Sequence, residues 1–156
     1  MIWHTAHDLY FPGDIVSPGR WGRIVLATGP VHPAYAREQW LEQVRAKVAP
    51  FAPSRLAVAF GHAERAAALG YMDPGERLYE VAALGTLVKL DMLWITWVRE
   101  SLDADDAPKA YRQAALYWQG HSTRDHMATA QPHWEFLALD GWRVVALLDD
   151  AEAASL

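Results

Sequence analysis

The chain contains no cysteine, and this absence removes several kinds of chemistry at once. Without thiols there is no disulfide bond, no thiolate zinc site and no cysteine nucleophile. The sequence also lacks the Gly-x-Gly-x-x-Gly and phosphate-loop motifs of nucleotide-binding proteins and the Gly-x-Ser-x-Gly motif of serine hydrolases. Any nucleotide must therefore be bound by another architecture.

Long apolar segments and an excess of positive charge are missing as well. No segment approaches the roughly 18 apolar residues that a membrane span needs, and the N-terminus lacks a basic stretch followed by an apolar one. We therefore expect a cytoplasmic protein with no membrane partner. The 14 Lys and Arg residues against 19 Asp and Glu residues give a net charge of −5. This balance argues against affinity gained by neutralising phosphates but leaves nucleic acid open as a substrate.

The chain has enough apolar residues to fill one core. Its 156 residues are 52% apolar and 21% charged, and they contain neither an internal repeat nor a low-complexity block. We expect a single domain over residues 1–149 and a frayed C-terminal tail over residues 150–156. Eight residues are tryptophan, which either fills a bulky core or forms a stacking surface for a flat ligand.

Turn residues and apolar periodicity predict an α+β fold. The turn Asp140-Gly141 predicts a hairpin between the last two strands. In the first long helix, charged residues such as Glu38 are expected to face water. We expect strands at Met1–Ala6, Arg55–Phe60, Arg77–Ala83, His133–Leu139 and Trp142–Leu148. We expect helices at 33–50, at His62–Leu69 and from a start at Asp105–Pro108 to a stop at Gly120, while Leu87–Val98 fits either type.

Two polar residues stand on strand faces that are otherwise apolar. Glu135 shares a face with Leu137, so it is either an edge residue in water or a carboxylate held in a cleft where its pKa can be tuned. His4 shares a face with Ile2, so it is either a satisfied core histidine or a residue that faces a ligand. A further group, consisting of His121, Asp125, His126 and His133, has a spacing that matches no closed zinc pattern, and we expect no metal site.

The segment from His4 to Arg20 carries the most specific motif of the chain. A histidine in the first strand is followed by Gly13-Asp14, two aliphatic residues and Pro18-Gly19-Arg20. At these offsets the segment resembles the opening of the rifampin ADP-ribosyltransferases. Further segments agree with this resemblance in their order along the chain.

Two of those segments, Val58–Gly61 and Arg77–Val81, resemble later strands of the same family. The segment Trp134–Val145 is similar to the glutamate strand and closing hairpin of DNA-directed ADP-ribosyltransferase toxins. The whole chain also resembles an uncharacterised bacterial domain family whose pattern appears here as Pro53-Ser54-Arg55, Tyr79-Glu80-Val81, Tyr117-Trp118-Gln119-Gly120 and Trp134-Glu135.

The resemblance implies a split, mostly antiparallel sheet of ADP-ribosyltransferase type that holds NAD, as a substrate, in a cleft. It implies a mono-ADP-ribosyltransferase, which is a glycosyltransferase, acting on a protein, a nucleic acid or a small molecule. A toxin of this kind would also have an antitoxin or immunity partner. The implied residues are Glu135, His4 and Asp91 for catalysis, and His4, Thr5, Gly19, Arg20, Ser54, Arg55, Phe60 and Tyr79 for NAD binding.

The resemblance also implies a role for three of these side chains. His4 would hydrogen-bond the ribose on the nicotinamide side, and Arg20 would contact the pyrophosphate as a bidentate donor. Glu135 would stabilise the oxocarbenium-like ribose as nicotinamide leaves. Trp3 and Trp134 flank the histidine and the glutamate but point to the opposite strand faces, so we expect them to support the cleft from behind.

One residue of the family pattern is absent, because the tyrosine after the second strand falls on Ala59. Tyr79 or Tyr117 could supply the missing hydroxyl, and Phe60 and Tyr79 are the residues expected to stack on nicotinamide. Asp91 rivals Glu135 as the acid, and we favour the glutamate because it starts a well-defined strand beside an aromatic residue. The missing tyrosine keeps open a catalytically degenerate nucleotide-binding or protein-interaction module of the same fold.

Overall fold

Seven strands form one antiparallel sheet around which the helices are arranged. The computed structural model describes residues 1–148, so the predicted tail lies outside the described residues. The sheet order is β2-β7-β4-β1-β3-β6-β5, and all neighbouring strands run antiparallel. The strands are β1 Ile2–Ala6, β2 Ile15–Val16, β3 Ala59–His62, β4 Arg77–Ala83, β5 Leu87–Asp91, β6 Trp134–Ala138 and β7 Trp142–Leu148. This architecture confirms the α+β class and the antiparallel sheet.

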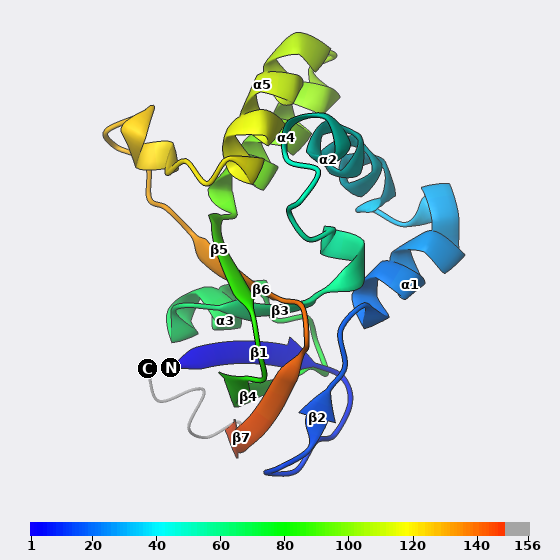
Figure 1. Cartoon of the computed structure of the whole chain (residues 1–156), viewed down its shortest axis with the longest axis vertical. Coiled ribbons are helices and arrows are strands. Elements are labelled where there is room, and N and C mark those ends of the chain that lie inside the picture. Colours follow the sequence, from blue (N-terminus) through cyan, green and yellow to red (C-terminus); the bar gives the residue numbers. More distant parts are fainter. Residues whose placement is uncertain (149–156) are drawn as a thin grey trace.

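Five α-helices and three short 3-10 turns are described in residues 1–148. Figure 1 shows α2, α4 and α5 gathered at one end of the molecule, with the sheet at the other end and α1 beside it. No helix of the described residues is both long and apolar enough to cross a membrane. The helices are α1 Arg20–Thr28, α2 Tyr35–Val48, α3 Arg65–Tyr71, α4 Leu93–Asp103 and α5 Ala107–Trp118, and the 3-10 turns are η1 Gly29–Val31, η2 Arg55–Ala57 and η3 Thr123–Asp125.

The two central strands, β1 and β3, separate after a short contact. They pair only at Trp3 and His62, whereas β1 pairs with β4 along its whole length. Beyond that contact, the imidazole Nδ1 of His4 lies 2.8 Å from the carbonyl oxygen of Phe60. The side chain of His4 thus occupies a carbonyl of β3 that could otherwise bond to the backbone of β1. The sheet therefore divides into two halves at the position of His4.

The inner faces of the two halves share one apolar core. Tyr79 and Trp142 from the first half pack together with Ala59 and Phe136 from the second. The indole Nε1 of Trp142 donates a 3.1 Å hydrogen bond to the carbonyl of Phe60 across this core. The two halves must therefore fold toward each other, since β7 and β3 are separated by two strands in the sheet order.

Helices cover the outer faces of both halves. A cluster of buried residues from α2, α4 and α5 packs on Leu90 and Leu137 of the second half. The helix α3 packs through Ala68 on Trp3 and Leu78 of the first half. Because burial of apolar surface is the main favourable term in folding, these clusters fix how the two halves and the helices sit around the split.

Several predicted elements differ from those observed. The segment Arg55–Phe60 begins with the 3-10 turn η2, so the strand starts later and includes His62. The predicted helix at His62–Leu69 is α3, which begins at Arg65 and continues past Gly70. The ambiguous run Leu87–Val98 contains both types, β5 followed by α4. The helix α1 was not predicted.

The predicted hairpin between the last two strands is wrong. The strand β6 pairs with β3 and β5, whereas β7 pairs with β4 and β2, so the chain crosses from one half-sheet to the other at the Asp140-Gly141 turn. Gly141 has φ +83°, and a Cβ there would meet the carbonyl oxygen of Val16. The glycine thus serves a close approach of β7 to β2 as well as a turn.

Candidate functional site

One cavity collects side chains from both halves of the divided sheet. Its volume is about 490 Å³, and it extends from the end of β1 past β3 to β6, with α1 on one side. The predicted site residues among its lining are His4, Thr5, Arg20, Arg55, Phe60 and Glu135. Residues far apart in the sequence are thus brought to a single concave surface.

The protonation state of His4 follows from its contact with a carbonyl. An oxygen of this kind only accepts hydrogen bonds, so Nδ1 of His4 carries the proton that it donates to the carbonyl of Phe60. Burial lowers the pKa of His4, against the smaller opposing effect of this bond. The ring is therefore neutral at pH 7, and its Nε2 is an acceptor for a ligand donor such as a hydroxyl.

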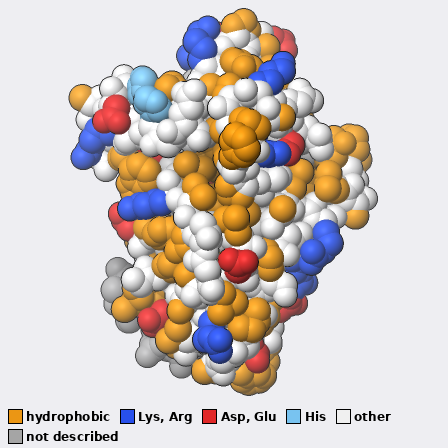
Figure 2. Space-filling model, in the orientation of Figure 1, with side chains coloured by type: hydrophobic (Ala, Val, Ile, Leu, Met, Phe, Trp, Pro, Cys, Tyr) orange, Lys and Arg blue, Asp and Glu red, His pale blue; other side chains and the backbone are white. Residues whose placement is uncertain are grey.

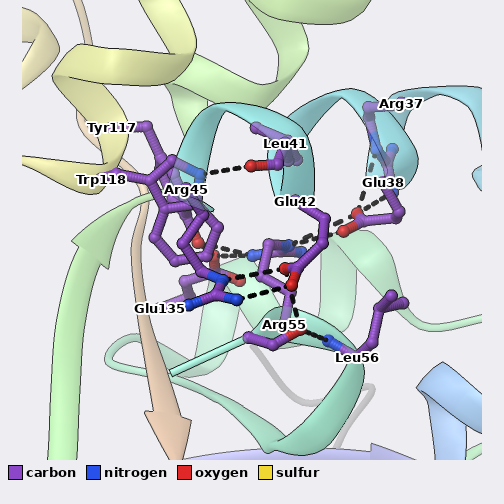
Figure 3. A network of polar contacts seen from close by, with 11 residues as sticks. Arg37, Glu38, Leu41, Glu42, Arg45, Arg55, Leu56, Tyr117, Trp118 and Glu135 are labelled. Atoms are coloured by element: carbon purple, nitrogen blue, oxygen red, sulfur yellow. Dashed lines mark hydrogen bonds and ion pairs between the residues drawn. The ribbon is translucent and has the colours of Figure 1, made fainter. Parts of the chain in front are cut away.

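Glu135 is held by two donors inside the molecule (Figure 3). The carboxylate is 2% exposed, and its Oε1 accepts hydrogen bonds from the Tyr117 hydroxyl at 2.7 Å and from Nη1 of Arg55. No hydrogen bond described within residues 1–148 engages its Oε2. Since Glu135 also lines the cavity, Oε2 is the oxygen that a ligand could meet.

Arg55 connects the two carboxylates of this network (Figure 3). Its Nε donates to Glu38 on α2 at 3.1 Å, and its guanidinium carbon lies 4.7 Å from the centre of the Phe60 ring. Burial alone would lower the pKa of Arg55, but the charges of Glu135 and Glu38 outweigh that effect and raise its pKa well above the ordinary value. The expectation that Glu38 faces water is wrong, because this side chain is 1% exposed and bound to the buried arginine.

Tyr117 completes the network as both acceptor and donor. Its hydroxyl accepts a 2.7 Å hydrogen bond from Nη1 of Arg55 and donates one to Glu135. Burial raises the pKa of Tyr117 well above its ordinary value, so the hydroxyl keeps the proton that it donates. Of the two tyrosines considered as hydroxyl donors, Tyr117 is therefore the one beside the glutamate, although it does not line the cavity.

The side of the cavity formed by α1 is more open. Arg20, the first residue of α1, forms an ion pair with Asp8, and its side chain is 53% exposed. The ring of Trp21 meets that of Phe60 edge-on at 5.3 Å between centroids. Gly19 stands just before the helix with φ +86°, and its N–H binds the carbonyl of Val58 at 3.0 Å. The glycine therefore positions α1 and does not itself line the cavity.

Two predicted site residues serve local structure outside the cavity. The hydroxyl of Ser54 caps η2 by accepting from the N–H of Leu56 and donates to Glu42 at 2.9 Å. Tyr79 is fully buried, and its hydroxyl donates to the carbonyl of Asp8 at 2.7 Å. The tyrosine is therefore not placed to stack on a ligand in the cavity.

Asp91 is also fully buried and has all its acceptor capacity in use. Its Oδ1 accepts from the N–H groups of Leu93 at 3.1 Å and His133 at 2.9 Å. Its Oδ2 accepts from the N–H and the hydroxyl of Thr123, both at 2.7 Å. These bonds join β5 to α4, to η3 and to the residue before β6, so the geometry favours Glu135 over Asp91 as the acid that meets a ligand.

A histidine pair that the sequence did not reveal lies at the cavity, with the ring of His62 lining it. Nδ1 of His62 lies 3.2 Å from Nε2 of His133, and the ring of Tyr71 stacks on that of His62 with centroids 5.9 Å apart. Burial, together with the nearby His133 and His4, lowers the pKa of His62 to about 4. If the alternation of side chains between the two faces of β3 is extended by two residues past Phe60, His62 falls on the strand and not in the predicted helix.

Within residues 1–148 no group of three or more His, Cys, Asp or Glu side chains could hold a metal ion. His133 pairs with His62, whereas the rings of His121 and His126 lie near each other with centroids 5.6 Å apart. The proposed supports, Trp3 and Trp134, are absent from the cavity lining.

No family model matches the sequence, and no curated protein matches it. Function must therefore be inferred from the geometry of the cavity.

Proposed function

We propose that the chain binds NAD in this cavity and transfers its ADP-ribose group to an acceptor, as a mono-ADP-ribosyltransferase. The observation that carries the proposal is the convergence of His4, Arg20, Phe60 and Glu135 on one cavity at the split of the sheet. These residues come from β1, α1, β3 and β6, so no local sequence pattern forces them together. His4 supplies a hydrogen-bond acceptor and Arg20 a cation. Phe60 supplies an aromatic ring and Glu135 a carboxylate, and the reaction needs all four groups.

The binding part of the proposal assigns one contact to each side chain. The neutral His4 accepts a hydrogen bond from the nicotinamide ribose through Nε2, since Nδ1 is held by Phe60. Arg20 contacts the pyrophosphate, and it can exchange its exposed partner Asp8 for the ligand because such surface ion pairs contribute little stability. The ring of Phe60 lies against nicotinamide in the role of the missing family tyrosine.

The chemical part rests on Glu135. As the bond between ribose C1′ and nicotinamide breaks, its electron pair leaves with nicotinamide and positive charge develops on the ribose. The carboxylate oxygen Oε2 stabilises that charge, while Arg55 and Tyr117 hold Oε1 and prevent the side chain from rotating. The acceptor then bonds to C1′ and loses a proton.

A second candidate function is an NAD-binding module without catalysis. The observation in its favour is that Glu135 is 2% exposed and bound to two donors, so it has little freedom to follow a reacting ribose. The alanine at position 59, where the resembling families carry tyrosine, points the same way. Both candidates predict NAD binding and differ only in turnover.

One pair of measurements separates these functions. Thermal unfolding with and without millimolar NAD reports binding, because a ligand that binds only the folded state raises its stability. Release of nicotinamide then reports cleavage, and Glu135→Gln is expected to abolish it while keeping the thermal shift. Glu100→Gln, at an exposed position on α4, is the matched control.

The outcomes are distinct. Cleavage by the wild-type protein that Glu135→Gln removes supports the transferase. A thermal shift without any nicotinamide release supports the binding module. The absence of a shift at millimolar NAD contradicts both.

A further inference from the structure

The paired histidines form part of the cavity wall beside the glutamate. His62 lies directly across from Glu135 in the register of β3 and β6, so both side chains stand on the same side of the paired strands. His62 and Tyr71 line the cavity, whereas His133 lies behind them and touches both rings. A ligand at Glu135 therefore meets His62 before it meets His133.

The hydrogen bond between the two rings fixes how they can share protons. When Nδ1 of His62 donates to Nε2 of His133, Nε2 of His62 is left as a bare acceptor. When Nε2 of His62 takes up a proton, the proton on its Nδ1 can pass to Nε2 of His133. The second ring then carries the new positive charge and the first ring stays neutral.

The surroundings favour this direction of transfer. Burial lowers the pKa of His133, but the carboxylates of Glu135, Asp91 and Glu64 oppose that effect and attract a proton to this ring. His62 has no such help, because burial and the two neighbouring histidines, His133 and His4, all lower its pKa. Positive charge is therefore more stable on the inner ring than on the one that faces the cavity.

We propose that His62 accepts the proton of the acceptor nucleophile and that His133 receives it through their shared hydrogen bond. This assignment rests on the proposed transferase function. In the step, a lone pair of the acceptor forms the bond to ribose C1′ as the bond from C1′ to nicotinamide breaks with its electron pair. The acceptor proton moves to Nε2 of His62, and the Nδ1 proton moves to Nε2 of His133. The products are nicotinamide, the ADP-ribosylated acceptor and a protonated His133.

The hydrogen-bonding state of His62 limits the class of acceptor. With Nδ1 held by His133, the neutral ring offers a bare Nε2 that can accept a proton but supplies no negative charge to hold a cationic acceptor such as a guanidinium. It can take the proton of a hydroxyl, because that proton becomes strongly acidic as the oxygen bonds to C1′. The acceptor class is therefore a neutral hydroxyl group, and methanol is its simplest probe.

The test compares His62→Asn, His133→Asn and the wild-type protein in the presence of NAD and methanol. The thermal shift with NAD reports the intact site, and formation of methyl ADP-ribose reports transfer. We expect His62→Asn to keep the thermal shift and to slow methanol transfer by about 100-fold, the usual effect of losing a general base. His133→Asn is expected to slow transfer less, because the first ring can still take the proton. The control is His121→Asn, at an exposed position outside the cavity.

Each remaining outcome decides against the assignment or its premise. Transfer by His62→Asn at the wild-type rate, with the thermal shift intact, overturns the role of the pair and leaves the transferase standing. A wild-type protein that binds NAD but forms no methyl product, or prefers agmatine to methanol, overturns the assignment as well. If the wild-type protein shows no thermal shift with NAD, the proposed function itself fails. If His62→Asn does not fold, His62→Gln takes its place in the transfer assay. The NMR coupling between Nδ1 of His62 and Nε2 of His133 in the wild-type protein then tests their hydrogen bond, and absence of that coupling overturns the proposed proton transfer between them.

Discussion

Arg55 and Glu135 are eighty positions apart in the sequence and form an ion pair in the interior, with side chains that are 5% and 3% exposed. Glu38 on α2 binds the same arginine, so one guanidinium serves two buried carboxylates. This relationship ties the helical layer to the strand that carries the proposed acid. Stability and site geometry therefore depend on the same side chain.

Replacing Arg55 should test that dependence. Arg55→Met leaves Glu135 buried without an ion-pair partner, whereas Glu38 keeps Arg37, and loss of one member of a buried ion pair typically costs about 3–5 kcal/mol. Urea unfolding at pH 7 measures the change. The double variant Arg55→Met/Glu135→Gln should recover part of the loss, because it removes the stranded charge of Glu135. A single variant as stable as the wild type would contradict the account.

Gly61 should not tolerate a side chain. A Cβ at this position would lie 2.7 Å from Cγ2 of Ile2 and 2.9 Å from Cζ2 of Trp142, in the core between the two half-sheets. Gly61→Ala should therefore reduce the free energy of unfolding by about 1–3 kcal/mol, as overpacking usually does. The matched control is Gly70→Ala within α3, where a Cβ meets nothing within 4 Å. That variant should be slightly stabilised, and equal effects of the two substitutions would argue against the packed split.

Asp91 and Glu135 should behave differently as acids. Asp91→Asn disrupts a carboxylate that accepts four hydrogen bonds, so it should lower stability by about 2–3 kcal/mol. The folded fraction should still release nicotinamide from NAD, because the aspartate does not line the cavity. Glu135→Gln should lose nicotinamide release per folded molecule, whatever the loss of its buried ion pair with Arg55 does to stability. The rate of nicotinamide release per folded molecule distinguishes the two variants. If only Asp91→Asn lost this activity, Asp91 and not Glu135 would be the acid.

Stability should fall on mild acidification because of His62. Its folded pKa of about 4 lies below the unfolded value of about 6.5, so the unfolded chain binds more protons between these values. The contribution is fully present above pH 6.5 and is lost as the pH falls toward 4. The loss from this residue is at most about 3 kcal/mol. Urea unfolding between pH 4 and pH 7 gives the free energy of unfolding of the wild type and of His62→Asn. This free energy should change more steeply with pH in the wild type, and equal pH dependence of the two proteins would contradict the prediction.

Local signals were sufficient for some elements. Asp106, followed by a proline, predicts the start of α5, and its side chain does cap the helix by accepting from the N–H of Lys109. The strand β4 was predicted with its observed bounds because alternation and the preceding turn lie within a few residues. Both predictions depend only on neighbours along the chain.

Signals that depend on distant partners were not readable from the sequence. Asp140-Gly141 looks like a hairpin turn, yet the partner of β7 is β4, and nothing near the turn specifies that pairing. Glu38 sits at a helix position typical of a solvated residue, and only Arg55 from another element explains its burial. The resemblance to known families did bring His4 and Glu135 together as candidates, but the histidine pair required the observed register of β3 and β6.

The face of the molecule in Figure 2 offers little support for recognition of a nucleic-acid backbone. On the face of residues 1–148 that Figure 2 shows, Lys and Arg side chains are scattered among apolar and acidic ones without a continuous basic band. This agrees with the net charge of −5 and with an acceptor that is recognised inside the cavity.

The central claim is that the cavity at the split of the sheet binds NAD, and calorimetric titration tests it most directly. The account predicts that the wild-type protein binds NAD with a submillimolar dissociation constant and that His4→Ala weakens binding about tenfold, the effect of losing one buried hydrogen bond. Glu100→Gln should bind as the wild type does. Absence of binding at millimolar NAD, or equal affinity of His4→Ala and wild type, would contradict the account.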